Sequence, residues 1–158
     1  MAAEEKIPAG LPSISVIIPA LDPGPELAEC LEPLRISSYP RFEVLVVDDG
    51  SAVPVEVSDP FRAIRLEENR GPAGARNAGA AAAAGEILLF IDTDVEIGAD
   101  CLRIVGDFYR DGANRDRGLT GLQSERMKFS NFSSACNCGF SSLKNTRVSL
   151  LNSKNRMP

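Results

Sequence analysis

Two aspartates separated by one residue follow a short apolar run near the middle of the chain. Ile87–Ile91 is long enough for one buried strand, and Asp92-Thr93-Asp94 comes directly after it. In extended backbone, residues two apart point to the same side, so both carboxylates should leave the strand end facing one way. Two hard oxygen ligands in this position suit Mg²⁺ or Mn²⁺ carrying a phosphorylated substrate. The alternative is that Asp92 only ends the strand and begins a turn.

Two earlier apolar runs also lead into acidic residues. Ile14–Ile18 is followed by a loop that ends at Asp22, and Phe42–Val47 runs into Asp48-Asp49-Gly50-Ser51. In open parallel sheets, ligands bind outside the carboxyl ends of the strands. We therefore expect five carboxylates to share this edge: Asp22, Asp48, Asp49, Asp92 and Asp94. For the adjacent pair, the alternative is a hydrogen-bonded turn, because Gly-Ser is good turn chemistry.

A glycine-rich segment, NRGPAGARNAG at 69–79, precedes the Ala78–Ala84 run. A helix that starts near Pro72 would point its positive end at anions, and Gly71 and Gly74 would let a ligand approach the backbone. Arg76 could then pair with a phosphate. Two alternatives stay open. The glycines could serve helix–sheet packing, and Arg76 could form a surface ion pair with Glu67 or Glu68.

The elements that must position these residues alternate between strands and helices. We expect strands at 14–18, 42–47, 63–66 and 87–91, and helices at 25–36, 72–84 and 99–109. This alternation predicts an α/β fold in three layers, α/β/α, with a mostly parallel sheet.

Charge divides the chain near Gly118. The net charge is −5, but residues 119–158 carry +5 and residues 1–118 carry −10. We therefore predict an α/β domain at 13–118 and a basic Ser/Asn-rich tail at 119–158. After about residue 134 we expect the tail to be poorly ordered or aberrant, because its few large apolar residues show no clear period: Leu143, Val148, Leu150 and Leu151. The overall negative charge argues against nucleic acid as a partner.

Composition also bears on the compartment. No apolar run approaches the ~20 residues that span a bilayer, and the first residues lack the features of a signal peptide. The chain has four scattered cysteines and no histidine, which disfavours a zinc site and fits reduced thiols. We expect a cytoplasmic protein without a transmembrane segment in this chain, associated with membranes only if a longer form exists.

Four segments together resemble the family 2 glycosyltransferases of the GT-A fold, which use nucleotide-diphosphate sugars. They are SVIIPALD at 15–22, VLVVDDGS at 44–51, NRGPAGARNAG at 69–79 and LLFIDTDVEI at 88–97, and the resemblance covers about Ser13–Asp111. It implies that the nucleoside meets Pro19, Ala20, Asp22, Asp48 and Asp49. It also implies that Arg76 lies near the base or the diphosphate. Asp92 and Asp94 would form the DxD motif, in which both hold Mn²⁺ or Mg²⁺ and Asp92 also meets the nucleotide. The aromatic-Asn pair usual after the first Pro-Ala is Leu21-Asp22 here.

The resemblance leaves the catalytic residue and the acceptor unidentified. Inverting transfer needs a base, which in this family is an acid well after the DxD motif, and the only carboxylate after Asp116 here is Glu125. We therefore expect a truncated, N-terminal donor-binding portion without an acceptor half. One alternative is a fragment that binds nucleotide without turnover. Another is a haloacid-dehalogenase-type phosphatase, which also has a strand followed by Asp-x-Asp but wants Thr or Val where Glu96 stands.

Overall fold

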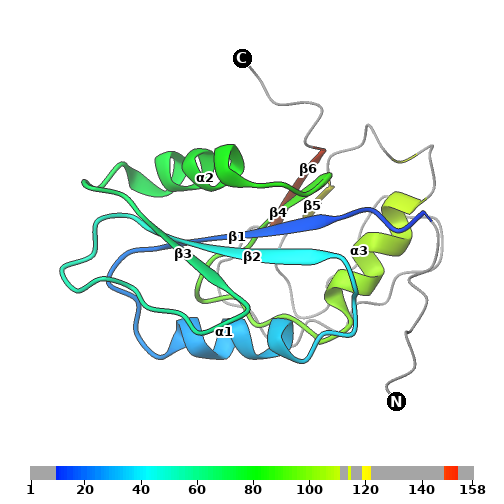
Figure 1. Cartoon of the computed structure of the whole chain (residues 1–158), viewed down its shortest axis with the longest axis horizontal. Helices are drawn as coiled ribbons and strands as arrows, with labels where there is room; N and C mark the ends of the chain where they lie inside the picture. Colours follow the sequence, from blue (N-terminus) through cyan, green and yellow to red (C-terminus); the bar gives the residue numbers. More distant parts are fainter. Residues whose placement is uncertain (1–9, 111–113, 115–118, 122–147, 153–158) are drawn as a thin grey trace.

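The structure is a computed structural model that describes residues 10–110, 114, 119–121 and 148–152. One sheet lies between two helical layers (Figure 1). Helices α1 (Glu26–Arg35) and α3 (Cys101–Arg110) pack on one face, and α2 (Gly71–Ala82) packs on the other. The expected three-layer α/β/α architecture is confirmed.

Four parallel strands make up most of the sheet: β1 (Ile14–Ala20), β2 (Phe42–Asp48), β3 (Arg62–Arg65) and β4 (Ile87–Phe90). The strand order is β3-β2-β1-β4-β6-β5, so β1 is flanked by β2 on one side and β4 on the other. Covered on both faces, β1 and β2 are apolar almost throughout, as buried parallel strands usually are.

Strand β1 continues through Pro19, which we expected to stop it. Pro19 lies opposite Val47 in the β1–β2 register. Backbone groups alternate sides along a strand, and the carbonyl of Ile17 faces β4, where it accepts from Ile91 N at 3.1 Å. The nitrogen of Pro19 therefore faces the β4 side, beyond the last β1–β4 pair at Phe90. The missing N–H costs no ladder hydrogen bond there.

Each of the three helices buries one face against the sheet or its neighbouring segments. Helix α1 buries Leu27, Cys30, Leu31 and Leu34. Helix α2 lies so close to the sheet that a Cβ on Gly79 would be 2.5 Å from Ile17 Cγ2. Helix α3 packs through Gly106 against the ring of Tyr39, whose hydroxyl donates to the carbonyl of Pro12 at 2.6 Å. None of the helices in the described part of the chain has the length and apolar content to cross a bilayer.

Two short strands follow the α/β core, and one of them lies beyond residue 134. Strand β6 (Val148–Asn152) pairs antiparallel with β4, and β5 (Leu119–Gly121) pairs antiparallel with β6. The sequence showed no clear period after about residue 134, yet residues 148–152 form a strand; that the tail is poorly ordered as a whole stays a prediction. The free edge of β4 offers unpaired backbone groups, and a five-residue segment can satisfy them without an amphipathic pattern. The rest of the predicted tail lies outside the described residues, and the domain boundary stays a prediction.

Candidate functional site

The segments that follow the parallel strands meet at one side of the sheet, which we call the carboxyl edge. Strands β1, β2 and β4 run parallel and end there, so the segments with Asp22, with Asp48 and Asp49, and with Asp92 and Asp94 all leave from this edge. Pro19 and Ala20 are the last residues of β1, and the carbonyl of Ala20 accepts from Asp49 N at 2.8 Å. Helix α2 begins at the same edge because it follows β3.

Asp22 connects the segments after β1 and β2. Its backbone N donates to Ser51 Oγ at 2.8 Å, and its Oδ1 accepts from Ala52 N at 2.8 Å. Its φ of +43° is a left-handed conformation, which Asp and Asn adopt more readily than most residues. The exposed Asp22 is therefore held in one conformation by its contacts with the neighbouring loop.

The carboxylate of Asp48 is buried and is used inside the protein. Oδ1 accepts from Ser51 N at 2.8 Å, and Oδ2 accepts from Val55 N at 3.1 Å and from Arg65 Nη1 at 2.7 Å. Burial opposes ionisation, but the hydrogen bonds from Ser51 and Val55 and the charge of Arg65 outweigh it and lower the pKa of Asp48. For this residue the contacts favour the hydrogen-bonded turn over a direct contact with the nucleoside.

Asp49 connects the same loop to the start of α2. Its Oδ1 accepts from Arg70 N at 2.8 Å. The next residue, Gly50, has a φ of +79°, and a Cβ there would lie 2.9 Å from the backbone N of Asn69. Only glycine lets the two segments approach this closely. The loop after β2 is thus fixed against both the Asp22 segment and the helix start.

The glycines of the 69–79 segment serve different structural purposes. Gly71 has a φ of +73°, and a Cβ on this residue would meet no atom within 4 Å, so the backbone turn requires glycine there rather than packing. A Cβ on Gly74 would meet the side chain of Arg70 at 2.5 Å. Close packing on the sheet falls to Gly79 instead. One alternative was that these glycines serve helix–sheet packing. Gly71 and Gly74 do not pack against the sheet, so that alternative does not apply to them.

Arg76 and Asp92 form an ion pair across the carboxyl edge, between Nη2 and Oδ1. Their side chains are 31% and 28% exposed, so the pair is neither dry nor fully in solvent. The alternative partners of Arg76, Glu67 and Glu68, are not the ones the structure shows; Glu68 lies beside Arg70 at 3.9 Å. A cation is thus already in contact with the first aspartate of the Asp-x-Asp motif.

The Asp-x-Asp motif lies in a turn, which corrects the expectation of extended backbone. Strand β4 ends at Phe90, and the carbonyl of Asp92 accepts from Val95 N at 3.1 Å. Strand alternation therefore does not set the directions of the two carboxylates, because the turn satisfies Asp92 O locally. The same carbonyl lies 3.7 Å from Cys30 Sγ of α1. Burial, followed by the charges of Asp94 and Asp92, raises the pKa of the Cys30 thiol to about 12, so it stays protonated.

The protein groups present at this turn fit a cation that is carried largely by its substrate. Among the residues that the structure describes, no three or more His, Cys, Asp and Glu gather closely enough to hold a metal ion. Mg²⁺ is usually held by one or two carboxylates together with substrate phosphates. Asp94 is exposed and Asp92 is half-buried, so two carboxylates of this kind are available.

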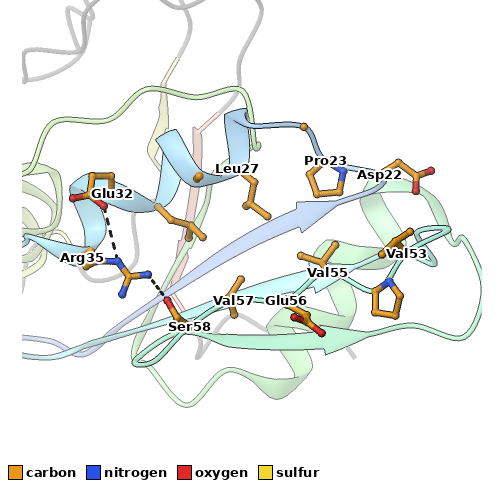
Figure 2. Close-up of a pocket in the computed structure, with 14 residues that line it drawn as sticks. Asp22, Pro23, Leu27, Glu32, Arg35, Val53, Val55, Glu56, Val57 and Ser58 are labelled. Carbon is orange, nitrogen blue, oxygen red and sulfur yellow. Dashed lines mark hydrogen bonds and ion pairs between the residues drawn. The ribbon is translucent and has the colours of Figure 1, made fainter.

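One cavity of the described structure lies beside this edge rather than at the Asp-x-Asp turn. It is an open groove of about 630 Å³ between α1 and residues 53–58. Figure 2 shows Leu27, Val55 and Val57 in the groove wall, with Asp22 at one end and Arg35 bonded to Ser58 and Glu32 at the other. Asp22 is the one sequence-predicted site residue among those lining it. We place the candidate site at the linked loops, where the charged groups meet, and not in this groove.

Sequence reasoning missed three features of this region. Neither Arg65 nor Cys30 was singled out from the sequence, and no sequence motif marks the groove. For Arg65, a signal exists only in its position at the end of a strand that neighbours β2. That Asp92 and Asp94 lie in one pocket with Asp48 and Asp49 stays a prediction.

Comparison with known proteins identifies relatives over the same part of the chain. The family model described as "Glycosyl transferase family 2" matches residues 15–116. An uncharacterized glycosyltransferase of Haemophilus influenzae is 40% identical over 85 residues, which is 51% of this chain and 29% of that protein.

Two solved structures share the fold. S. aureus TarS (1–349) in complex with UDP-GlcNAc is 30% identical, with a TM-score of 0.58, over 68% of this chain and 33% of that one. Mannosyltransferase PcManGT from Pyrobaculum calidifontis in complex with GDP-Man and Mn²⁺ is 24% identical, with a TM-score of 0.58, over 76% and 38%. At that identity the second likeness shows the fold alone. The match therefore covers roughly a third of the Haemophilus influenzae protein and of each of these two solved chains.

Proposed function

Because the chain belongs to glycosyl transferase family 2, we propose that its α/β domain binds a nucleotide-diphosphate sugar as the donor portion of a glycosyltransferase. The observation that carries the proposal is the Arg76–Asp92 pair beside the exposed Asp94 at the carboxyl edge. One guanidinium and two carboxylates supply the groups that a diphosphate and its divalent cation need. The complex of TarS with UDP-GlcNAc supports the substrate class.

The linked loops form the nucleoside part of the proposed site. Asp22 and Asp49 lie on the two segments that the carboxyl edge ties together, and a carboxylate can accept the N–H of a uracil-like base. Pro19 and Ala20 end the strand that leads into this loop. Asp48 supports the loop from inside, since its oxygens are bonded to Ser51, Val55 and Arg65.

The diphosphate part of the proposed site uses Arg76, Asp92 and Asp94. Asp92 and Asp94 would hold Mn²⁺ or Mg²⁺, which neutralises the charge of a departing nucleoside diphosphate. Arg76 would leave Asp92 for the phosphates when the donor binds, because its guanidinium can bind two phosphate oxygens at once. Its half-buried position on α2 keeps it at the edge in either state.

Transfer to an acceptor is a proposal for the whole protein, because this chain spans roughly a third of its relatives' length. Among the described residues we assign no catalytic base. Nucleotide binding without turnover is therefore the second candidate for the chain by itself. The family match sets the phosphatase alternative aside.

Calorimetric titration tests the donor site directly. UDP or GDP should bind saturably with Mn²⁺, and both EDTA and Asp94→Ala should weaken binding by at least about tenfold, since a metal–carboxylate contact is lost. Asp107→Ala is the matched control, because Asp107 is a surface carboxylate of α3 paired with Arg103 and Arg110. Binding that is insensitive to EDTA would remove the metal from the proposal. If the protein bound neither UDP nor GDP, the proposed function would be refuted.

A further inference from the structure

Arg65 is the last residue of β3, and its side chain is hydrogen-bonded to the end of β2 and to the loop that follows it. Its Nη1 donates to Asp48 Oδ2 at 2.7 Å, and its Nη2 donates to the carbonyl of Ser51 at 2.9 Å. One planar side chain thus holds a buried carboxylate and a backbone carbonyl three residues apart in the chain. A guanidinium can do this with fixed geometry, whereas an ammonium is a point charge.

Within β3, these two hydrogen bonds depend on the position of Arg65 at the end of the strand. Arg62 is the other arginine of β3, and it lies 3.6 Å from Glu43 with 63% of its side chain exposed. In the β2–β3 register Arg62 is opposite Leu45, whereas Arg65 is opposite Asp48 at the carboxyl edge. The two arginines share a strand and a charge, but only Arg65 reaches the loop.

The loop that Arg65 holds is the one on which two other segments depend. Ser51 Oγ accepts from Asp22 N, and Asp49 Oδ1 accepts from Arg70 N. Any shift of residues 49–51 would therefore move the Asp22 segment and the start of α2 as well. The Asp-x-Asp turn has contacts of its own, with Val95, Arg76 and Cys30.

We propose that Arg65 is a positioning residue that holds residues 49–51 in the shape that receives the nucleoside of the donor. This inference rests on the proposed function and adds a residue to its nucleoside half. Arg65 acts through Asp48 and Ser51 and not by touching the reacting atoms. It sets nucleotide affinity without changing the metal dependence, which belongs to the other half of the site.

Arg65→Lys is the decisive variant. Lysine keeps a charge beside Asp48 but cannot also bond the Ser51 carbonyl in the same fork, so the fold should remain while the loop loosens. UDP or GDP affinity should fall about five- to tenfold, the value of one lost hydrogen bond in a preorganised site. The ratio of affinities with Mn²⁺ and with EDTA should stay as in the unsubstituted protein. Amide exchange at Ser51 and Arg70 should become faster.

The matched control is Arg62→Lys, which should change none of these values. If Arg65→Lys does not fold, the double variant Asp48→Asn with Arg65→Gln removes both charges together and is expected to show the same loss of affinity. Unchanged nucleotide affinity in folded Arg65→Lys, or a loss confined to the Mn²⁺-dependent part, would overturn the inference and leave the proposed function standing. No nucleotide binding by the unsubstituted protein would overturn both.

Discussion

Replacing Arg76 by glutamine should affect the metal and the nucleotide in opposite directions. In the structure the Arg76 guanidinium contacts Asp92 directly, so a divalent cation that arrives alone must compete with it. Glutamine removes this competition and the repulsion between two cations, so the affinity for Mn²⁺ alone should rise. The same change removes the proposed guanidinium–phosphate contact, so the affinity for UDP or GDP with Mn²⁺ should fall.

The size of the first effect follows from the burial of the pair. Two unit charges about 4 Å apart attract by about 4 kcal/mol at an effective dielectric constant near 20, whereas fully exposed pairs contribute about 0–1 kcal/mol. With side chains 31% and 28% exposed, the Arg76–Asp92 pair lies between these limits. We expect about 1–2 kcal/mol, which is a roughly five- to thirtyfold gain in Mn²⁺ affinity. The lost charge-assisted contact should weaken nucleotide binding by about 1.5–3 kcal/mol.

A Mn²⁺ titration monitored by electron paramagnetic resonance measures the change in metal affinity. Calorimetry with UDP or GDP in the presence of Mn²⁺ measures the change in nucleotide affinity. Arg70→Gln is the control, because Arg70 precedes α2 and its backbone N–H to Asp49 survives the substitution. Its side chain lies 3.9 Å from the exposed Glu68 and not beside Asp92. A variant Arg76→Gln that binds Mn²⁺ no better than the unsubstituted protein would refute the reasoning.

Two predictions concern stability. The lowered pKa of Asp48 contributes free energy of unfolding that is present above the ordinary value of 3.8 and is lost as the pH falls through the lower, folded-state pKa. In urea unfolding from about pH 6 to about pH 2.5, the gap in stability between the unsubstituted protein and Asp48→Asn should therefore shrink; a constant gap would contradict this. Gly79→Ala should cost about 1–3 kcal/mol of unfolding free energy, because its Cβ would clash with Ile17 and Val47. Gly24→Ala, whose Cβ would meet only the carboxylate end of the flexible Glu26 side chain, should be close to neutral, and equal losses for both would refute the packing argument.

The parts of the fold that the sequence predicted well are those set by burial on both faces. Strand β2 is apolar almost throughout because helices cover both sides of the sheet, so its position follows largely from composition. Pro19 shows the limit of this reasoning. Whether a proline ends a strand depends on which neighbour its nitrogen faces and where that neighbour ends, and neither is a local property.

The candidate site divides in the same way. The carboxylates at strand ends were predictable because parallel strands must end at one edge. Their partners could not be predicted. Arg65, which pairs with Asp48, comes from a different strand, and Arg76 pairs with Asp92 although other carboxylates lie nearer to it in the sequence. The backbone after β4 turns because Val95 satisfies Asp92 O, a contact that the Asp-x-Asp spacing does not reveal. Strand β6 escaped notice because it depends on an available edge more than on its own pattern.

The place of β1 between β2 and β4 has a consequence for how the protein folds as it is made. The partner on one side, β2, follows after a single helix, but β4 emerges from the ribosome only after β3 and α2. At roughly 5–20 residues per second, the apolar central strand waits about 4–14 seconds with the backbone groups of one edge unpaired. Contacts between distant parts of a chain also form slowly because the intervening loop must close. The nascent chain is therefore most exposed to misassociation in this interval, and a chaperone that binds extended apolar segments should engage Ile14–Ala20 before β4 is complete.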